Sequence, residues 1–140
     1  MGLDQYLYAS KYTSNAEWRG EDEQKVFNDL LTAIDGEKFA DADCPSIIID
    51  LKVGYWRKAN QIHQWFVKNV QSGEDNCAEY YVSREQLQEL RNACMEVIKD
   101  ENKADELLPT QSGFFFGSTE IDEWYWQDVK ATVEIIDRCL

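Results

Sequence analysis

The residues best suited to chemistry lie close together near the middle of the chain: Arg57, Lys58 and His63, the only histidine. An arginine can grip a phosphate with two parallel N–H groups, and a histidine can act as an acid or base near neutral pH. Gly54 precedes them and predicts the start of a helix over residues 55–71, which also favours an anion. These side chains could therefore bind an anionic ligand such as a nucleotide. The alternatives are that the two cations pair with neighbouring acids and that His63 is a hydrogen-bonded core residue.

A carboxylate in the last predicted helix is a candidate partner for this cluster. When that helix is projected at about 100° per residue, Asp128 falls beside Trp124 and Ile135 on the apolar side. A buried carboxylate without a partner is costly, so we expect Asp128 to pair with Arg57 or His63. Such a pair would either tie two helices together or complete the ligand site.

The charge of the chain is strongly negative and unevenly distributed. The 140 residues hold 27 acids and 14 bases, which gives a net charge of −13. Residues 51–73 contain no acid and carry +4, so the remainder carries −17. The four bases are Lys52, Arg57, Lys58 and Lys68. An acidic protein repels phosphates, which argues against direct binding to nucleic acid or to an anionic membrane and favours a protein partner with a basic surface.

Two runs of acids and one tryptophan are the candidate contacts for such a partner. The acids are Glu21, Asp22 and Glu23 in one run, and Glu120, Asp122 and Glu123 in the other. Trp65 is predicted on the polar side of the helix over residues 55–71. Tryptophan and arginine anchor many protein interfaces, so Trp65 could contact a partner or a second copy in a homodimer. The alternative is that another element covers it.

A predicted alternation of strands and helices positions these residues. Apolar residues at helical spacing predict helices over residues 21–34, 55–71 and 83–99, and a last helix begins near residue 118 or 119. Aromatic or alternating runs predict strands over residues 3–8, 46–53, 80–82 and 114–116. The expected fold class is α+β, a compact single domain over residues 1–140 that is helix-dominated and has a small sheet of short strands.

Familiar catalytic, cofactor and metal motifs are missing from the sequence. It has no GxxxxGK[ST] loop, GxGxxG turn or HExxH helix, so we expect no cofactor, no metal and a role in binding rather than turnover. The four cysteines form no CxxC pair, and the first residues do not look like a secretion signal. Free, mostly buried thiols in a cytoplasmic protein are therefore expected. No apolar run reaches the length of a membrane span.

Several stretches together resemble one family. They are MGLDQYLY at residues 1–8, VGYWRKANQIHQWF at 53–66, LPTQSGFFFGS at 108–118, and the acids and aromatics of 122–128. The chain resembles small, mostly uncharacterised proteins of bacteriophages and prophages that begin MGLD-x-Y and carry a YWRK…H-x-W motif and a GFFFG segment. Position 5 is Gln, where that pattern usually has Met. The resemblance implies that Trp56, Arg57, Lys58, His63 and Trp65 belong to one pattern.

A phage origin and an acidic surface together predict a function. Phage proteins that block host defences often bind basic grooves, and some imitate the phosphates of DNA. We therefore expect a viral accessory protein in the host cytoplasm that binds a host protein. Its expected target is a nucleic-acid-targeting defence, as in anti-CRISPR proteins. Acidity that serves solubility alone is the alternative.

Overall fold

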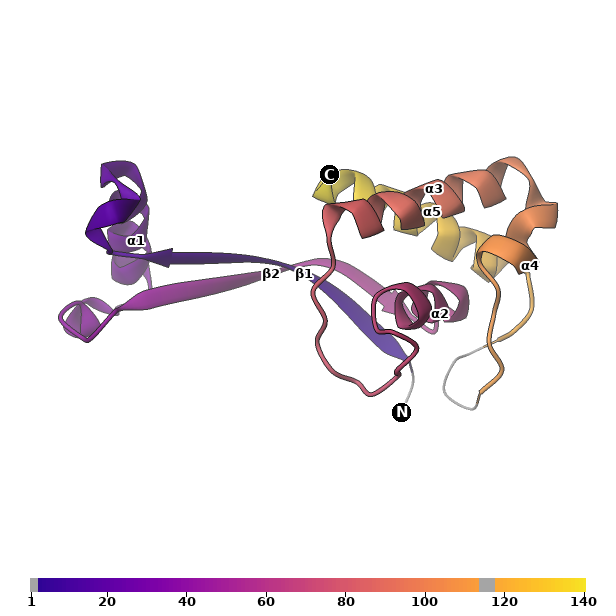
Figure 1. The fold of residues 1–140 in the computed structure, drawn as a ribbon, viewed down its shortest axis with the longest axis horizontal. Coiled ribbons are helices and arrows are strands. Elements are labelled where there is room, and N and C mark those ends of the chain that lie inside the picture. The colour runs from indigo at the N-terminus through magenta and orange to yellow at the C-terminus, as the bar shows by residue number, and fades with distance from the viewer. Residues whose placement is uncertain (1–2, 114–117) are drawn as a thin grey trace. The chain divides into compact units, whose positions relative to one another are not determined.

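The computed structural model describes residues 3–113 and 118–140. Two strands form one sheet, and helices make up most of the remaining regular structure, so the α+β fold class is confirmed (Figure 1). The strand predicted over residues 114–116 lies outside the described residues. In chain order the elements are β1 (Asp4–Ser14), η1 (Glu17–Arg19), α1 (Glu21–Ala33), η2 (Glu37–Phe39), β2 (Ser46–Arg57), α2 (Asn60–Asn69), α3 (Arg84–Lys99), η3 (Glu101–Lys103), α4 (Ala104–Leu107) and α5 (Glu123–Cys139).

Contacts between Cα atoms divide the predicted single domain into two units. The first unit comprises residues 3–7 and the described part of residues 53–140, and the second comprises residues 8–52. β1 and β2 are antiparallel, because Tyr6 stacks on Tyr55 whereas Ser10, later in β1, donates to Asp50, earlier in β2. Strands of 11 and 12 residues are longer than the short strands predicted from the sequence.

The helix predicted over residues 55–71 begins later, at Asn60. Residues 55–57 instead end β2. Just beyond them, the N–H of Lys58 donates to the carbonyl of Leu3 at 2.7 Å, so pairing with the first strand extends to this point. Lys58 then adopts a φ of 56°, in the left-handed region, which separates the strand from the helix. Pairing with the first strand therefore overrides the helical spacing of the apolar residues here.

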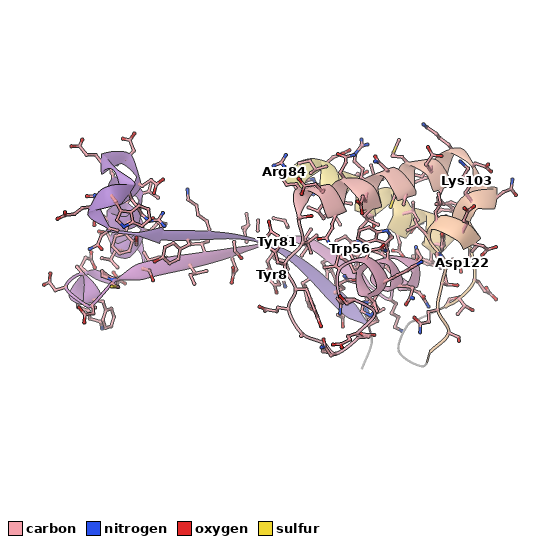
Figure 2. The ribbon with its side chains drawn as sticks, in the orientation of Figure 1. Tyr8, Trp56, Tyr81, Arg84, Lys103 and Asp122 are labelled. Carbon is pink, nitrogen blue, oxygen red and sulfur yellow. The ribbon has the colours of Figure 1, made fainter. Side chains whose placement is uncertain are left out.

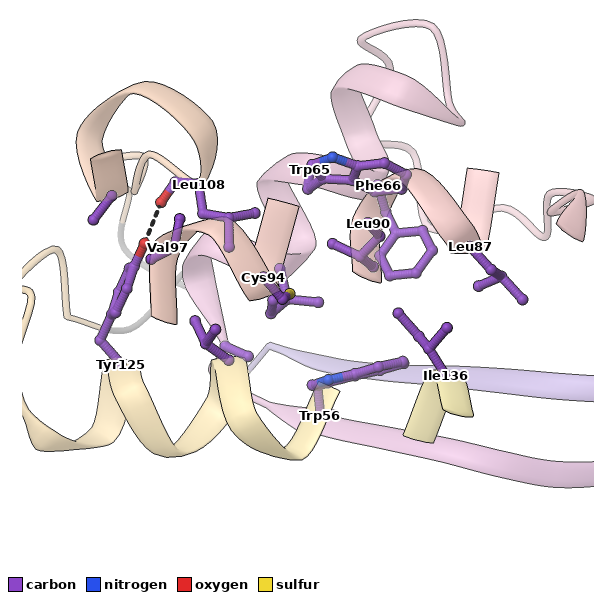
Figure 3. Packing of buried hydrophobic residues seen from close by; sticks show 14 residues of the cluster. Trp56, Trp65, Phe66, Leu87, Leu90, Cys94, Val97, Leu108, Tyr125 and Ile136 are labelled. Atoms are coloured by element: carbon purple, nitrogen blue, oxygen red, sulfur yellow. Dashed lines mark hydrogen bonds between the residues drawn. The ribbon is translucent and has the colours of Figure 1, made fainter. Parts of the chain in front are cut away.

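The core of the first unit lies between α3 and α5, which run side by side, and α2 also packs against α5 (Figure 1). Figure 3 shows the indole of Trp56 among these buried side chains. The hydroxyl of Tyr125 donates to the carbonyl of Leu108 at 2.7 Å within the same cluster. Apolar residues with at most 1% exposure include Ile62, Leu90, Cys94, Val97, Ala104, Leu108, Val129 and Ile136.

The start of α3 follows the sequence signal. The hydroxyl of Ser83 accepts from the N–H of Gln86 at 3.1 Å, and the side chain of Gln86 accepts from the N–H of Ser83 at 2.9 Å. This capping box fixes the helix start that the sequence predicts. The strand predicted over residues 80–82 does not form: these residues have no regular structure, and the sheet of the described residues consists of β1 and β2 alone.

α5 starts at Glu123, later than the predicted start near residue 118. The cause is the side chain of Asp122, which accepts from the N–H of Tyr125 at 3.1 Å and caps the helix. Its buried face matches the centre of the predicted apolar face, but Trp124, which was predicted on the apolar side, is 72% exposed. The buried face comprises Tyr125, Val129, Thr132 and Ile136.

The second unit has little buried apolar surface. In its single long helix, α1, only Phe27 and Leu31 are buried, and the helix spans nearly the predicted residues 21–34. Thr13 and Ser14 at the end of β1 are also buried. Most other large apolar side chains of this unit are exposed, and they form part of the candidate site.

Four free cysteines differ in their exposure. Cys94 is buried and Cys139 is half-buried, as predicted. Cys44 and Cys77 are exposed, so the prediction of mostly buried thiols is wrong for these two; both lie outside the helices and strands and adopt a positive φ. Within residues 3–113 and 118–140, no helix has the length and apolarity needed to cross a membrane, and no group of His, Cys, Asp and Glu side chains could hold a metal ion.

Candidate functional site

The cations of the predicted ligand site do not lie at a helix start. Gly54 is inside β2, Arg57 ends that strand, and Lys58 follows it. The side chains of Arg57 and Lys58 are exposed. The prediction that Gly54 opens a helix beside Arg57 is therefore wrong. Among the described residues, the ion pairs found do not include Arg57 or Lys58, so the alternative of pairing with acids is not observed either.

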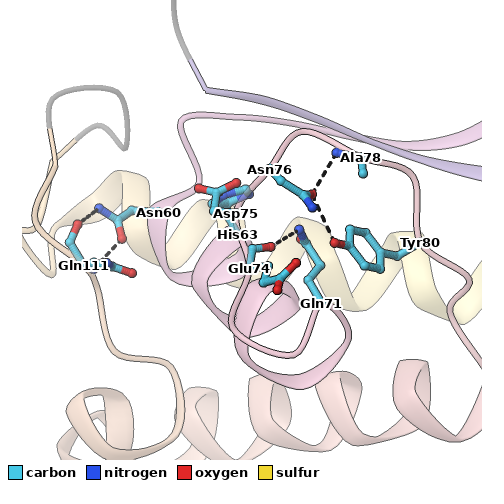
Figure 4. A network of polar contacts seen from close by, with 9 residues as sticks. All are labelled: Asn60, His63, Gln71, Glu74, Asp75, Asn76, Ala78, Tyr80 and Gln111. Carbon is cyan, nitrogen blue, oxygen red and sulfur yellow. Dashed lines mark hydrogen bonds and ion pairs between the residues drawn. The ribbon is translucent and has the colours of Figure 1, made fainter.

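His63 forms a mostly buried pair with a carboxylate of the loop that follows α2. Its Nε2 lies 3.0 Å from Oδ2 of Asp75, and the two side chains are 10% and 33% exposed (Figure 4). Asp75 also lines a cavity of about 370 Å³, together with Gln64 and Lys68. The alternative that His63 is a hydrogen-bonded core residue is confirmed, and the predicted pairing with Asp128 is wrong.

Other polar contacts around α2 also join it to loops. The amide of Asn60 donates to the carbonyl of Gln111 at 2.6 Å and accepts from the N–H of the same residue at 2.6 Å (Figure 4). Within the following loop, Gln71 donates to the carbonyl of Glu74 at 2.9 Å. Together these contacts hold two loops in place beside α2. The pair formed by His63 is therefore one of several polar contacts that position these loops.

Asp128 lies in a different environment from the one predicted. It is half-buried, and burial raises the pKa of its carboxyl to about 6, with a further increase from the negative charge of Asp122. No basic group acts to lower that pKa. The predicted pair with Arg57 is therefore wrong, because the nearby charge is another carboxylate.

Trp65 is covered by protein. It is 8% exposed, and its ring contacts that of Phe66 at 5.4 Å in an edge-on arrangement. Trp65 belongs to the buried core cluster that also contains Leu90 of α3, and Figure 3 shows its ring beside Phe66 and Leu90. The interpretation of Trp65 as an exposed contact is wrong, and with it the homodimer patch centred on Trp65.

The two acidic runs differ in what they leave exposed. Glu21, Asp22 and Glu23 form the exposed first turn of α1. In the second run, Glu120 and Glu123 are exposed, whereas Asp122 is occupied as the cap of α5. The first run therefore leaves Glu21 and Asp22 available, since Glu23 pairs with Arg19, while Asp122 of the second run has a structural role.

Next to the first run is an aromatic cluster that sequence reasoning missed. Trp18 is 79% exposed, and the guanidinium carbon of Arg19 lies 4.7 Å from the centre of its ring and 5.0 Å from that of Tyr12. Arg19 also donates to Glu23 at 3.0 Å. The adjacent residues Trp18 and Arg19 were the available sequence signal. We call the following set the Trp18 surface: Tyr12, Trp18, Arg19, Glu21, Asp22, Glu23 and Val26.

The remainder of the second unit also exposes apolar side chains, and Figure 2 shows side chains projecting from the ribbon of this unit, with Tyr8 labelled. A cavity of about 190 Å³ is lined in part by Tyr12, Arg19 and Val26, three residues of the Trp18 surface. Exposed apolar patches of this kind mark interaction sites. The exposed large apolar residues of the unit are Tyr8, Tyr12, Trp18, Val26, Ile34, Phe39, Ile48, Ile49 and Leu51.

Comparisons with known proteins found no match: none of the protein-family models, curated proteins or solved structures searched is similar to this chain. The phage resemblance of the sequence motifs therefore stays a prediction.

Proposed function

We propose that the protein acts by binding another protein, with the Trp18 surface as the contact. One observation carries this proposal: Trp18 is 79% exposed, and its ring stacks with the guanidinium of Arg19. Tryptophan and arginine dominate the binding energy of many interfaces. An indole that is already held in place also loses little conformational freedom when a partner covers it.

The acids beside Trp18 support a partner with a basic surface. Glu21 and Asp22 are exposed in the first turn of α1, in a chain whose net charge is −13. Complementary charge speeds association, most strongly at low ionic strength. The partner that fits best therefore presents an apolar pocket for the indole, surrounded by lysine or arginine.

We further propose that the protein is a phage-type accessory protein that inhibits a nucleic-acid-targeting defence in the host cytoplasm. Two sequence features support this: the phage-like motifs and the excess of acids. Proteins that bind DNA or RNA present basic surfaces to phosphates. An acidic protein can occupy such a surface in place of the nucleic acid.

The test is capture of partners from host lysate by the immobilised full-length protein, followed by affinity measurement with the purified partner. Trp18→Ala should weaken binding by about 2 kcal/mol, roughly thirtyfold in Kd. Trp124→Ala is the matched control, because Trp124 is 72% exposed but lies in α5 of the other unit. Its Kd should stay within twofold of the wild-type value.

A double variant tests the role of the negative charge beside Trp18. Glu21→Gln with Asp22→Asn should slow association at low salt and flatten its salt dependence, while the dissociation rate changes little. Equal affinity of wild type and Trp18→Ala for the captured partner would show that the Trp18 surface is not the contact. Association rates that do not depend on salt would remove the basic partner.

A further inference from the structure

A separate surface lies along one edge of the sheet. Because the sheet has two strands, β1 covers one edge of β2 and no strand of the described residues covers the other. Backbone hydrogen bonds made outside the regular elements do not involve residues 46–52 in the described chain. A free edge of this kind offers its N–H and C=O groups to another strand.

The sequence of this edge favours strand pairing. Residues 47–49 are three isoleucines, which have high β-propensity, and Ile48 and Leu51 are 67% and 63% exposed. Natural proteins protect long edges with proline, bulges or central lysines, because an open apolar edge aggregates. In β2 the proline, Pro45, precedes the strand and the lysine, Lys52, follows the isoleucines, so the isoleucine run itself carries neither. A defined partner strand would keep this edge from aggregating.

Charged residues at the same edge indicate which strand fits. Asp50 and Lys52 flank Leu51. If β2 paired antiparallel with β2 of a second chain, with the two Leu51 residues opposite each other, Asp50 of each chain would face Lys52 of the other. Directly opposite side chains share a face of the sheet, with Cβ atoms about 5 Å apart. Two ion pairs then lie on one face of the sheet, and the two Leu51 side chains face each other on the opposite face, which is the symmetric arrangement of a two-fold dimer.

We propose that β2 pairs with β2 of a second copy, antiparallel and centred on Leu51, to give a four-stranded sheet. Asp50 accepts from Ser10 in its own chain, and a carboxylate has further lone pairs to offer. Lys52 also interacts within its own chain, and its ammonium group has three donors. The surface is distinct from the Trp18 surface, so a failure of this proposal leaves the proposed function standing.

Charge exchange tests the proposal in sedimentation velocity of the full-length protein over a range of concentrations. The wild type should dimerise. Asp50→Lys places two lysines opposite each other at both symmetric positions, and Lys52→Asp places two carboxylates there. Each single variant should therefore dimerise about tenfold more weakly. An equimolar mixture of the two variants should recover the dimer, because every facing pair then has opposite charges.

Two controls separate the interface from the fold. Ser10→Ala removes the same contact within the chain that Asp50→Lys removes, and should dimerise like the wild type. Leu51→Cys, with Cys44→Ser and Cys77→Ser to remove the exposed thiols, should form a disulfide between copies on oxidation. Ile48→Cys in the same background should not, because its two copies lie about 20 Å apart in this register.

Three results would overturn the proposal. They are a wild-type protein that stays monomeric at every concentration, a dimer that neither charge variant weakens, and a mixture of the variants that associates no better than either alone. A disulfide that forms through Ile48→Cys but not through Leu51→Cys would overturn the register.

Discussion

The indole N–H of Trp56 donates to the hydroxyl of Thr132 at 2.9 Å, which joins the end of β2 to the middle of α5. The same hydroxyl donates to the carbonyl of Asp128, one turn earlier in the helix, at 2.7 Å. Trp56 is 4% exposed and Thr132 is fully buried. A polar link therefore lies inside an apolar core, where an unpaired N–H group is costly.

Thr132→Val should destabilise the protein by about 1–3 kcal/mol, because valine keeps the shape of threonine but leaves the indole N–H of Trp56 without an acceptor. The measurement is the free energy of unfolding in urea. Thr132→Ser is the control, since it keeps the hydroxyl and removes one methyl group, at a cost of about 1 kcal/mol. A valine variant as stable as the serine variant would show that the hydrogen bond contributes nothing measurable.

Asp128→Asn should stabilise the protein at pH 7.5 and change little at pH 4. The folded pKa of Asp128 is about 6, raised from an ordinary value of 3.8 by burial first and by Asp122 second. At a pH between these two pKa values the folded state binds more protons than the unfolded state. The contribution of this group to stability therefore falls as pH rises from 3.8 and levels off above pH 6. Because the group is only half-buried, the expected gain at pH 7.5 is about 1 kcal/mol.

The measurement is the difference in melting temperature between Asp128→Asn and wild type at the two pH values. Glu134→Gln removes the same charge from an exposed position of the same helix and controls for the net charge of −13. An identical gain in both variants, or an equal gain at both pH values, would contradict the assignment to Asp128.

Signals that act within one segment of the sequence predict two of the helices closely. Residues 21–34 and 83–99 match α1 and α3 closely, because the apolar spacing acts within each segment and a capping box at Ser83 also fixes the start of α3. The buried face of α5 was also predictable from its spacing. Its start was not, since Asp122 competes with the earlier Ser118 and Thr119 as a cap and forms the bond.

Long-range contacts account for the errors at the candidate site. Residues 55–57 have apolar helical spacing but become strand, because the neighbouring Lys58 pairs with Leu3. Helical projection assigns Trp65 to the polar side, but Trp65 is buried in the core cluster of the first unit. The partner of His63 is Asp75, just past the segment without acids, and nothing in a helical projection indicates that the loop folds back.

The thiols should react in the order of their exposure. With a thiol reagent, Cys44 and Cys77 should react at once in the native protein and Cys139 more slowly. Cys94 should react only after unfolding, because burial raises its pKa to about 12 and the thiolate is the reactive form. Cys44→Ser with Cys77→Ser should abolish the fast phase. Reaction of Cys94 in the native protein, identified by mapping the modified residue, would contradict its burial.

Gly54→Ala should destabilise the first unit by about 1–3 kcal/mol. A methyl group at this position of β2 would lie 2.8 Å from Cγ2 of Ile135 and 3.1 Å from the ring of Trp56, both closer than ordinary packing. Ile135→Ala removes that Cγ2 atom, so the cost of Gly54→Ala should be smaller in the Ile135→Ala background. Unfolding of the four proteins in urea gives the coupling energy between the two positions. Strictly additive costs would show that the strand and the helix have room to separate, and that glycine is not required here by contact with α5.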